Sequence, residues 1–164
     1  MKAVLRGYVR IVDMINKVMG YVLMVMLGTM TFIIFWNVFS RFVAGSSLAW
    51  SEELSRFLMI FMIFIGASIA LRSNELIAVE MLLERLVGKP KKVLYILIHL
   101  VSIVFFVILI KYGYAMADSF SNQKAPSLGV SMQVIYLSLP LGGVLLLINS
   151  MACIVEEMIG KGEK

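Results

Sequence analysis

The fold is decided by the stretch Trp50-Ser51-Glu52-Glu53-Leu54-Ser55-Arg56, which leads directly into the uncharged run Phe57–Leu71. An indole ring favours the headgroup level of a membrane, so Trp50 marks a membrane surface. Ser51 can cap a helix by accepting from an exposed N–H, and the two glutamates that follow lie favourably at the positive end of the helix dipole. The stretch therefore predicts that a membrane-spanning helix begins here.

Two interpretations of the charges at this helix start remain open. The simpler one is an ordinary helix start with an interfacial anchor, in which Glu52 and Arg56 form an i,i+4 pair. The other is a docking surface. Glu53 has Phe57 at its i+4 position, so its carboxylate can pair with Arg41 across the connection or with a charge on another protein. On this second interpretation Arg41, Glu52, Glu53 and Arg56 form a linked polar set that can be partly dehydrated against a partner.

Composition places the whole chain in lipid. Of its 164 residues 61% are hydrophobic and 15% are charged, and the mean hydropathy is +0.96. A spanning helix needs roughly 20 mostly apolar residues, so this length allows about four or five spans and no separate enzyme domain. Cys153 is the single cysteine and lies in an apolar run, which argues against a disulfide framework or a thiol metal site. We expect no enzyme, no cofactor, no metal ion and no nucleic-acid partner.

The predicted architecture is an all-α integral membrane protein, formed by residues 1–164 as one four-helix domain. The apolar runs predict four spans, at about residues 18–40, 52–72, 93–115 and 130–155. The first run is too long for the apolar part of a signal peptide, so we expect it to be retained. Apolar residues at three- and four-residue steps predict an amphipathic surface helix at about 74–87. The segment Pro140-Leu141-Gly142-Gly143 predicts a kink in the middle of the fourth span.

Basic residues predict the orientation. The amino-terminal segment, the 72–92 connection and the carboxy-terminal tail carry four, five and two of the 15 lysines and arginines, and the opposite side carries the other four. Because basic residues concentrate on the cytoplasmic side, both termini are expected in the cytoplasm. The Trp50 to Arg56 stretch then faces outward.

Polar and small residues inside the spans predict contacts between helices. His99 is the only histidine, and without acidic neighbours it is better explained as a neutral, hydrogen-bonded residue between helices than as a proton relay. Gly66 lies in a pattern of small residues that allows a neighbouring helix to approach closely. All ten acidic residues lie near span ends or in connections, whereas a proton- or ion-coupled carrier normally keeps an ionisable residue near the midplane. On its residues alone, the chain builds an interface and is not a transporter by itself.

Several short motifs follow one another in a characteristic order: Arg41-Phe42, Leu48–Glu53, Arg56, Gly66–Arg72, Glu75, Val79-Glu80 and Tyr136–Gly142. This order resembles a known family, the DctQ-type small membrane subunit of tripartite ATP-independent periplasmic (TRAP) transporters. The resemblance covers nearly the whole chain. The chain departs from the family pattern at Leu76, where a histidine is frequent, and at Glu80, where an aspartate is common.

The resemblance implies a multi-pass protein of the bacterial inner membrane that braces a larger subunit. That large subunit would carry the substrate and sodium sites, and a periplasmic binding protein would deliver an organic acid such as a C4-dicarboxylate, a keto acid or sialic acid. The residues expected at partner interfaces or in structural roles are Arg41, Trp50, Glu52, Glu53, Arg56, Gly66, Arg72, Glu75 and Glu80. Two alternatives remain. One is a small self-assembling drug/proton exporter, which would need a carboxylate in its first span, where residues 18–40 have none. The other is a structural tetraspan protein without transport.

Overall fold

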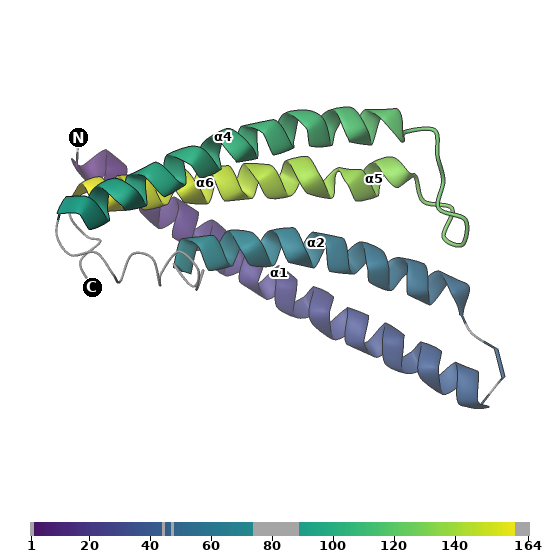
Figure 1. Ribbon diagram of the computed structural model, residues 1–164. Helices are drawn as coiled ribbons and strands as arrows, with labels where there is room; N and C mark the ends of the chain where they lie inside the picture. The colour runs from purple at the N-terminus through teal and green to yellow at the C-terminus, as the bar shows by residue number, and fades with distance from the viewer. Residues whose placement is uncertain (1, 44, 47, 74–88, 160–164) are drawn as a thin grey trace.

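The computed structural model describes residues 2–43, 45–46, 48–73 and 89–159, and almost all of them are helical (Figure 1). The helices are α1 (Lys2–Val43), α2 (Ala49–Ser73), α4 (Lys89–Ser119), α5 (Met132–Tyr136) and α6 (Ser138–Ile159). Four stretches are long and apolar enough to cross a membrane: 5–43, 49–73, 90–119 and 132–157. The predicted all-α fold with four spans is confirmed. The expected surface helix at 74–87, with Glu75 and Glu80, lies outside the described residues.

Helix α1 is much longer than the uncharged run that predicted it. The amino-terminal segment ahead of residue 18 continues the same helix, and its Val9 and Val12 are buried. At 1.5 Å per residue, the 42 residues of α1 extend about 63 Å, roughly twice the thickness of a hydrocarbon core. A helix of this length must either tilt strongly or extend beyond the membrane.

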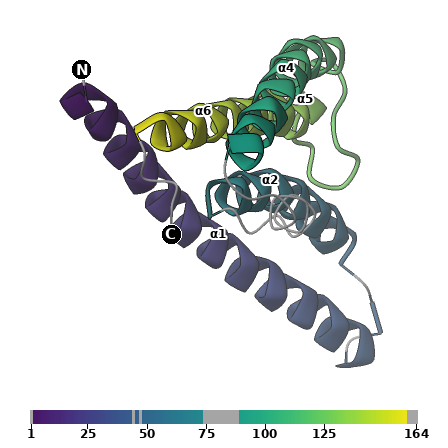
Figure 2. The same ribbon diagram turned by 60° about the vertical axis from the view of Figure 1, so that its left-hand side comes forward.

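The spans form an open row in the order α4, α6, α2, α1 (Figure 1). Helix α6 contacts α4, α2 and α1, and α1 also packs along α2. Within the described residues, neither α1 nor α2 packs against α4. Figure 2 shows α1 running obliquely across the other helices, with its amino-terminal part beside the carboxy-terminal part of α6. The row is therefore not closed into a bundle, and both of its faces are accessible to lipid or to another membrane protein.

Helix α6 is the centre of the row. Half of the most apolar window of its span is buried inside the protein, against 6% for the window of α1. The core cluster joins Leu71 of α2, Phe106 of α4 and Leu146 of α6, with Phe64 and Leu147 packed against it. The outward faces of α1 and α4 are left with exposed large apolar side chains, as lipid or a membrane partner requires.

The fourth span breaks at a different place from the one predicted. The interruption lies at Leu137, between α5 and α6, and α6 runs unbroken through Gly142 and Gly143. A proline ring clashes with the carbonyl four residues earlier, which for Pro140 is that of Tyr136, the last residue of α5. Pro140 therefore sits in the first turn of a new helix, where proline is tolerated, and the break moves ahead of it.

The glycines of α6 allow neighbouring helices to approach closely. A Cβ atom built on Gly142 would lie 2.5 Å from the Cβ of Phe64 in α2. One built on Gly143 would lie 2.8 Å from Cγ1 of Ile110 in α4. Because the atoms met at Phe64 are at the base of its side chain, a change of rotamer cannot relieve the first clash. These two adjacent glycines thus set the spacing of α6 to both of its neighbours.

The amino-terminal end of α1 and the carboxy-terminal end of α6 lie at the same end of the row (Figure 1). The start of α4 and the end of α2 lie at that end too. This arrangement places the basic amino-terminal segment and the basic start of α4 on one side, for which the distribution of lysine and arginine predicts the cytoplasm. We call this the inner end and the opposite one the outer end.

Gly142→Ala is expected to destabilise the folded chain by about 1–3 kcal/mol, the usual cost of overpacking. The matched control is Gly28→Ala in α1, where an added Cβ meets nothing within 4 Å. That change should be neutral or mildly stabilising, because alanine favours helix over glycine by about 1 kcal/mol. Thermal unfolding of the two variants in detergent tests the difference. Equal melting temperatures would contradict the close approach of α2 and α6.

Candidate functional site

Glu53 at the outer end holds the loop between α4 and α5. Its Oε2 accepts from the backbone N–H groups of Ser127 and Leu128, each at 2.9 Å. The loop is closed on itself as well, because the Ala125 N–H donates to the Val130 carbonyl at 2.8 Å. Hydrogen bonds to a charged acceptor are stronger than neutral ones. The carboxylate that was expected to pair with Arg41 or with another protein therefore fixes a surface loop 74 residues away along the chain.

The start of α2 is fixed by an asparagine of α1. Asn37 Oδ1 accepts from the backbone N–H of Leu48 at 2.9 Å, which ties the connection between the first two spans to α1. Ser51 does not cap the helix as predicted. Its buried hydroxyl donates to the Leu48 carbonyl at 2.6 Å instead, because α2 already begins at Ala49 and Ser51 lies inside its first turn.

The predicted polar set at the outer end does not form. Arg41, Glu52 and Arg56 are exposed, and no ion pair joins them to one another or to Glu53 in the part of the chain that the structure describes. The prediction failed because Glu53 is drawn to the loop across from it. Trp50 remains 40% exposed beside these charges, so the outer end carries an accessible aromatic and charged surface.

Gly66 faces the first span. A Cβ built on it would lie 3.5 Å from Cδ1 of Leu23, an ordinary van der Waals contact. The small residue thus lies where α2 packs along α1, within the chain itself.

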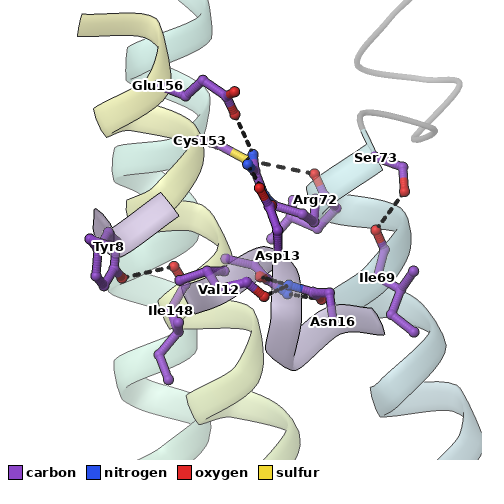
Figure 3. Close-up of polar contacts among 12 residues, drawn as sticks. Tyr8, Val12, Asp13, Asn16, Ile69, Arg72, Ser73, Ile148, Cys153 and Glu156 are labelled. Carbon is purple, nitrogen blue, oxygen red and sulfur yellow. Dashed lines mark hydrogen bonds and ion pairs between the residues drawn. The ribbon is translucent and has the colours of Figure 1, made fainter. Parts of the chain in front are cut away.

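Arg72 lies at the centre of a polar network at the inner end (Figure 3). Its Nη2 lies 2.8 Å from Oδ1 of Asp13 in α1, and its Nε donates to the same oxygen at 2.9 Å. Its Nη1 donates to Oε2 of Glu156 in α6 at 2.7 Å. The Arg72 side chain is 13% exposed, against 52% for Asp13 and 28% for Glu156. One guanidinium group therefore joins three helices.

A second set of contacts, further from the end of α6 than Glu156, joins the same three helices. Asn16 and Asn149 exchange hydrogen bonds, with Nδ2 to Oδ1 distances of 2.6 and 2.9 Å. Asn149 also donates to the backbone carbonyl of Ser68 in α2 at 2.8 Å. The hydroxyl of Tyr8 donates to the Ile148 carbonyl at 3.1 Å (Figure 3). Side-chain hydrogen bonds of this kind hold helices together where no hydrophobic driving force separates protein from lipid.

His99 joins α4 to α6, as predicted. Its Nδ1 lies 3.0 Å from the hydroxyl of Ser150, which in turn donates to the His99 backbone carbonyl at 3.2 Å. The ring is 3% exposed and packs against the edge of Tyr95 with centroids 4.5 Å apart. The predicted interhelical hydrogen bond of His99 is confirmed.

Sequence reasoning named Arg72 but missed its partners. Those partners are Asp13 and Glu156, and the asparagine pair Asn16 and Asn149 beside them was not singled out either. A usable signal was present. Each is a polar residue in or beside an apolar run, and such residues pair with one another because lipid offers no other partner.

These contacts fix the helices relative to one another. Among the described residues, no group of three or more histidine, cysteine, aspartate or glutamate side chains is placed to hold a metal ion. The charges of Asp13, Arg72 and Glu156 compensate one another, and Asn16, Asn149 and His99 are hydrogen-bonded between helices.

Arg72→Gln is expected to lower the free energy of unfolding by about 1–3 kcal/mol. This lies between the 3–5 kcal/mol lost when a buried pair is broken and the 0–1 kcal/mol of an exposed pair. The matched control is Lys92→Gln, which removes the more exposed pair with Glu157 at 3.3 Å and should cost less than about 1 kcal/mol. Chemical unfolding of both variants in mixed micelles measures the difference, and equal costs would show that Arg72 does not hold the row together.

Comparison with known proteins identifies the family. The family model of the DctQ component of tripartite ATP-independent periplasmic transporters matches residues 30–159. The chain is 24% identical over 144 residues to the sialic acid TRAP transporter small permease protein SiaQ of Vibrio cholerae, which covers 88% of the chain and 83% of SiaQ. It is 30% identical over 108 residues to the ectoine TRAP transporter small permease protein TeaB of Halomonas elongata, covering 65% of the chain and 56% of TeaB.

A third relative is much longer. The chain is 27% identical over 111 residues to the sialic acid TRAP transporter permease protein SiaT of Haemophilus influenzae, covering 68% of the chain but 18% of SiaT. The resemblance found in the sequence is confirmed. With the four apolar helices, these similarities make the chain a multi-pass protein of the bacterial inner membrane. The family model spans most of the chain, which therefore belongs to the DctQ family, the small permease subunits of TRAP transporters.

Proposed function

We propose that this chain braces the large transport subunit of a sodium-coupled TRAP transporter for an organic acid and helps to dock its periplasmic binding protein. The observation that carries the proposal is the open row of helices. Its inner end is fixed by Arg72, and its α1 and α4 faces are left apolar and exposed. A membrane helix face of this kind packs against lipid or another spanning protein.

The relatives support a large membrane partner. SiaT is named a permease protein, and a segment similar to this chain makes up 18% of it. In SiaT this segment is part of a much longer chain. Such a chain is expected if a small and a large subunit that pack side by side have been fused. The relatives SiaQ and TeaB belong to transporters of sialic acid and of ectoine, respectively. We therefore extend only the broad class, a carboxylate-bearing organic solute, to this chain.

The distribution of charged residues favours an accessory role for the chain in the transporter. The acidic residues of the described chain lie near the ends of spans, whereas a coupling site needs ionisable groups deeper in the membrane. The first uncharged run, at 18–40, holds no carboxylate, so a self-assembling proton-coupled exporter is not favoured. A structural protein with no link to transport is not favoured either, given the family.

We place the partner contacts at the outer end. Arg41, Trp50, Glu52 and Arg56 are exposed there, next to the loop that Glu53 holds. A binding protein approaches from the periplasm and can reach only this end. Glu53 acts as a positioning residue in this proposal, because it sets the position of the loop and does not itself meet the partner. Gly66 and Arg72 serve the packing of the chain, and Glu75 and Glu80 are proposed for the inner side.

The first test is reconstitution in liposomes. This chain alone should show no sodium-dependent uptake of any organic acid, and the large subunit with its binding protein should transport well only when the chain is present. The large subunit without this chain serves as the comparison. Uptake by the isolated chain would overturn the proposal, as would full activity of the large subunit in its absence.

The second test addresses the outer end. Glu53→Gln replaces a charged acceptor by a neutral one, so the hold on the loop weakens from about 1.5–3 to 0.5–1.5 kcal/mol for each hydrogen bond. We expect lower uptake and a lower yield of assembled transporter. Asp118→Asn is the matched control, because it removes an exposed carboxylate at the same outer end of the row. If both variants assemble and transport like the wild type, the loop held by Glu53 is not a docking element.

A further inference from the structure

One side of the amino-terminal part of α1 carries a row of exposed basic side chains. Arg6, Arg10 and Lys17 are all exposed, and their spacing of four and seven residues places them within about 40° of one another around the helix. No ion pair joins any of the three to an acid in the described part of the chain. We call these three residues the basic stripe.

The one acid near the basic stripe is already used inside the protein. Asp13 is the only aspartate or glutamate in the first 51 residues, and it pairs with Arg72 at 2.8 Å. At the same end, Glu156 pairs with Arg72 and Glu157 with Lys92. The internal network thus neutralises its own carboxylates and leaves the basic stripe facing outward without an acidic partner.

An exposed apolar stripe runs beside the basic one. Ile11, Met14 and Val18 are 55%, 62% and 53% exposed and lie at i, i+3 and i+7, about 100° around the helix from the basic stripe. The opposite side, with Val9 and Val12, is buried. A helix segment with adjacent basic and apolar exposed faces is typical of one that lies at the membrane surface.

The packing of α1 on α6 sets the depth of this segment. Tyr8 bonds to the carbonyl of Ile148, and Asn16 pairs with the next residue, Asn149. The two contact residues are eight positions apart in α1 but adjacent in α6. Helix α1 therefore crosses α6 at a steep angle (Figures 2 and 3). Ile148 lies 11 residues before the end of α6 at Ile159, which is about 16 Å of helix. The basic stripe thus lies alongside the inner part of the bundle and does not project far beyond it.

We propose that the basic stripe binds the anionic headgroups of phospholipids in the cytoplasmic leaflet, with Ile11, Met14 and Val18 against their acyl chains. Three positive charges without internal partners match a negative headgroup, and the long basic side chains reach the surface while their stems cover apolar neighbours. The contact holds the amino-terminal part of the oblique helix α1 at the membrane surface. It is independent of which solute the transporter carries.

The test measures lipid binding by the full chain in a neutral detergent, by native mass spectrometry with added phosphatidylglycerol or phosphatidylcholine. The variant is Arg6→Gln/Arg10→Gln/Lys17→Gln. Each basic residue near an anionic surface contributes about fivefold to binding, so the triple variant should bind phosphatidylglycerol on the order of a hundredfold more weakly. Phosphatidylcholine, which carries the same phosphate with no net charge, should bind weakly to both forms.

The matched control is Arg41→Gln/Lys111→Gln/Lys124→Gln, which removes the same charge from exposed positions at the outer end. It should retain phosphatidylglycerol binding within about threefold of the wild type, since it leaves the stripe intact. Circular dichroism confirms that both triple variants remain helical. The proposal is overturned if the stripe variant binds phosphatidylglycerol like the wild type, if the control loses as much, or if phosphatidylcholine binds as tightly. An unchanged lipid affinity with loosened assembly would assign the stripe to a protein partner.

Discussion

The two ion pairs of Arg72 are the interaction on which the arrangement of the chain depends. A guanidinium group at the membrane border is stable only if its charge is compensated, and the compensating carboxylates come from Asp13 of α1 and Glu156 of α6. These pairs tie the second, first and fourth spans together at one end. They also fix the position along α1 at which it crosses its neighbours, which places the basic stripe beside α6.

Beyond this network, the helices are held together by close packing and by interhelical hydrogen bonds. Because the lipid is as apolar as the side chains, close contact and satisfied polar groups hold the helices together. Gly142 and Gly143 bring α6 against its neighbours, and the paired asparagines and His99 lock its rotation. The result is a row centred on α6 in which α1 and α4 each keep a large free face. Such a row suits a subunit that supports another membrane protein.

The sequence predicted what depends on composition and on long patterns. The four apolar runs predicted the four spanning helices correctly, because the cost of burying polar and charged groups in lipid overrides weaker preferences. His99 was placed correctly because a buried polar side chain in a span needs a partner. The length of α1 was missed, since an amphipathic segment beside an apolar run carries no stop signal.

The parts that could not be predicted depend on which distant residues meet. Glu53 faces a loop 74 residues away, and nothing in the local pattern distinguishes that partner from Arg41. The partners of Arg72 come from the two ends of the chain, 59 and 84 residues away. The break at Leu137 follows from the proline three residues later, although the glycines beside it suggested a bend further along. In each case the local sequence allowed several pairings or backbone conformations of similar energy, and a tertiary contact determined which one forms.

The central claim is that the Arg72 network gives the row of helices one fixed arrangement without help from a partner. The most direct measurement is the distance distribution between spin labels on Val22 of α1 and Tyr112 of α4, both exposed, by pulsed electron paramagnetic resonance in a Cys153→Ser background. We predict one narrow distribution for the chain alone, which broadens when Arg72→Gln is added. A distribution that is equally broad with and without Arg72 would contradict the account.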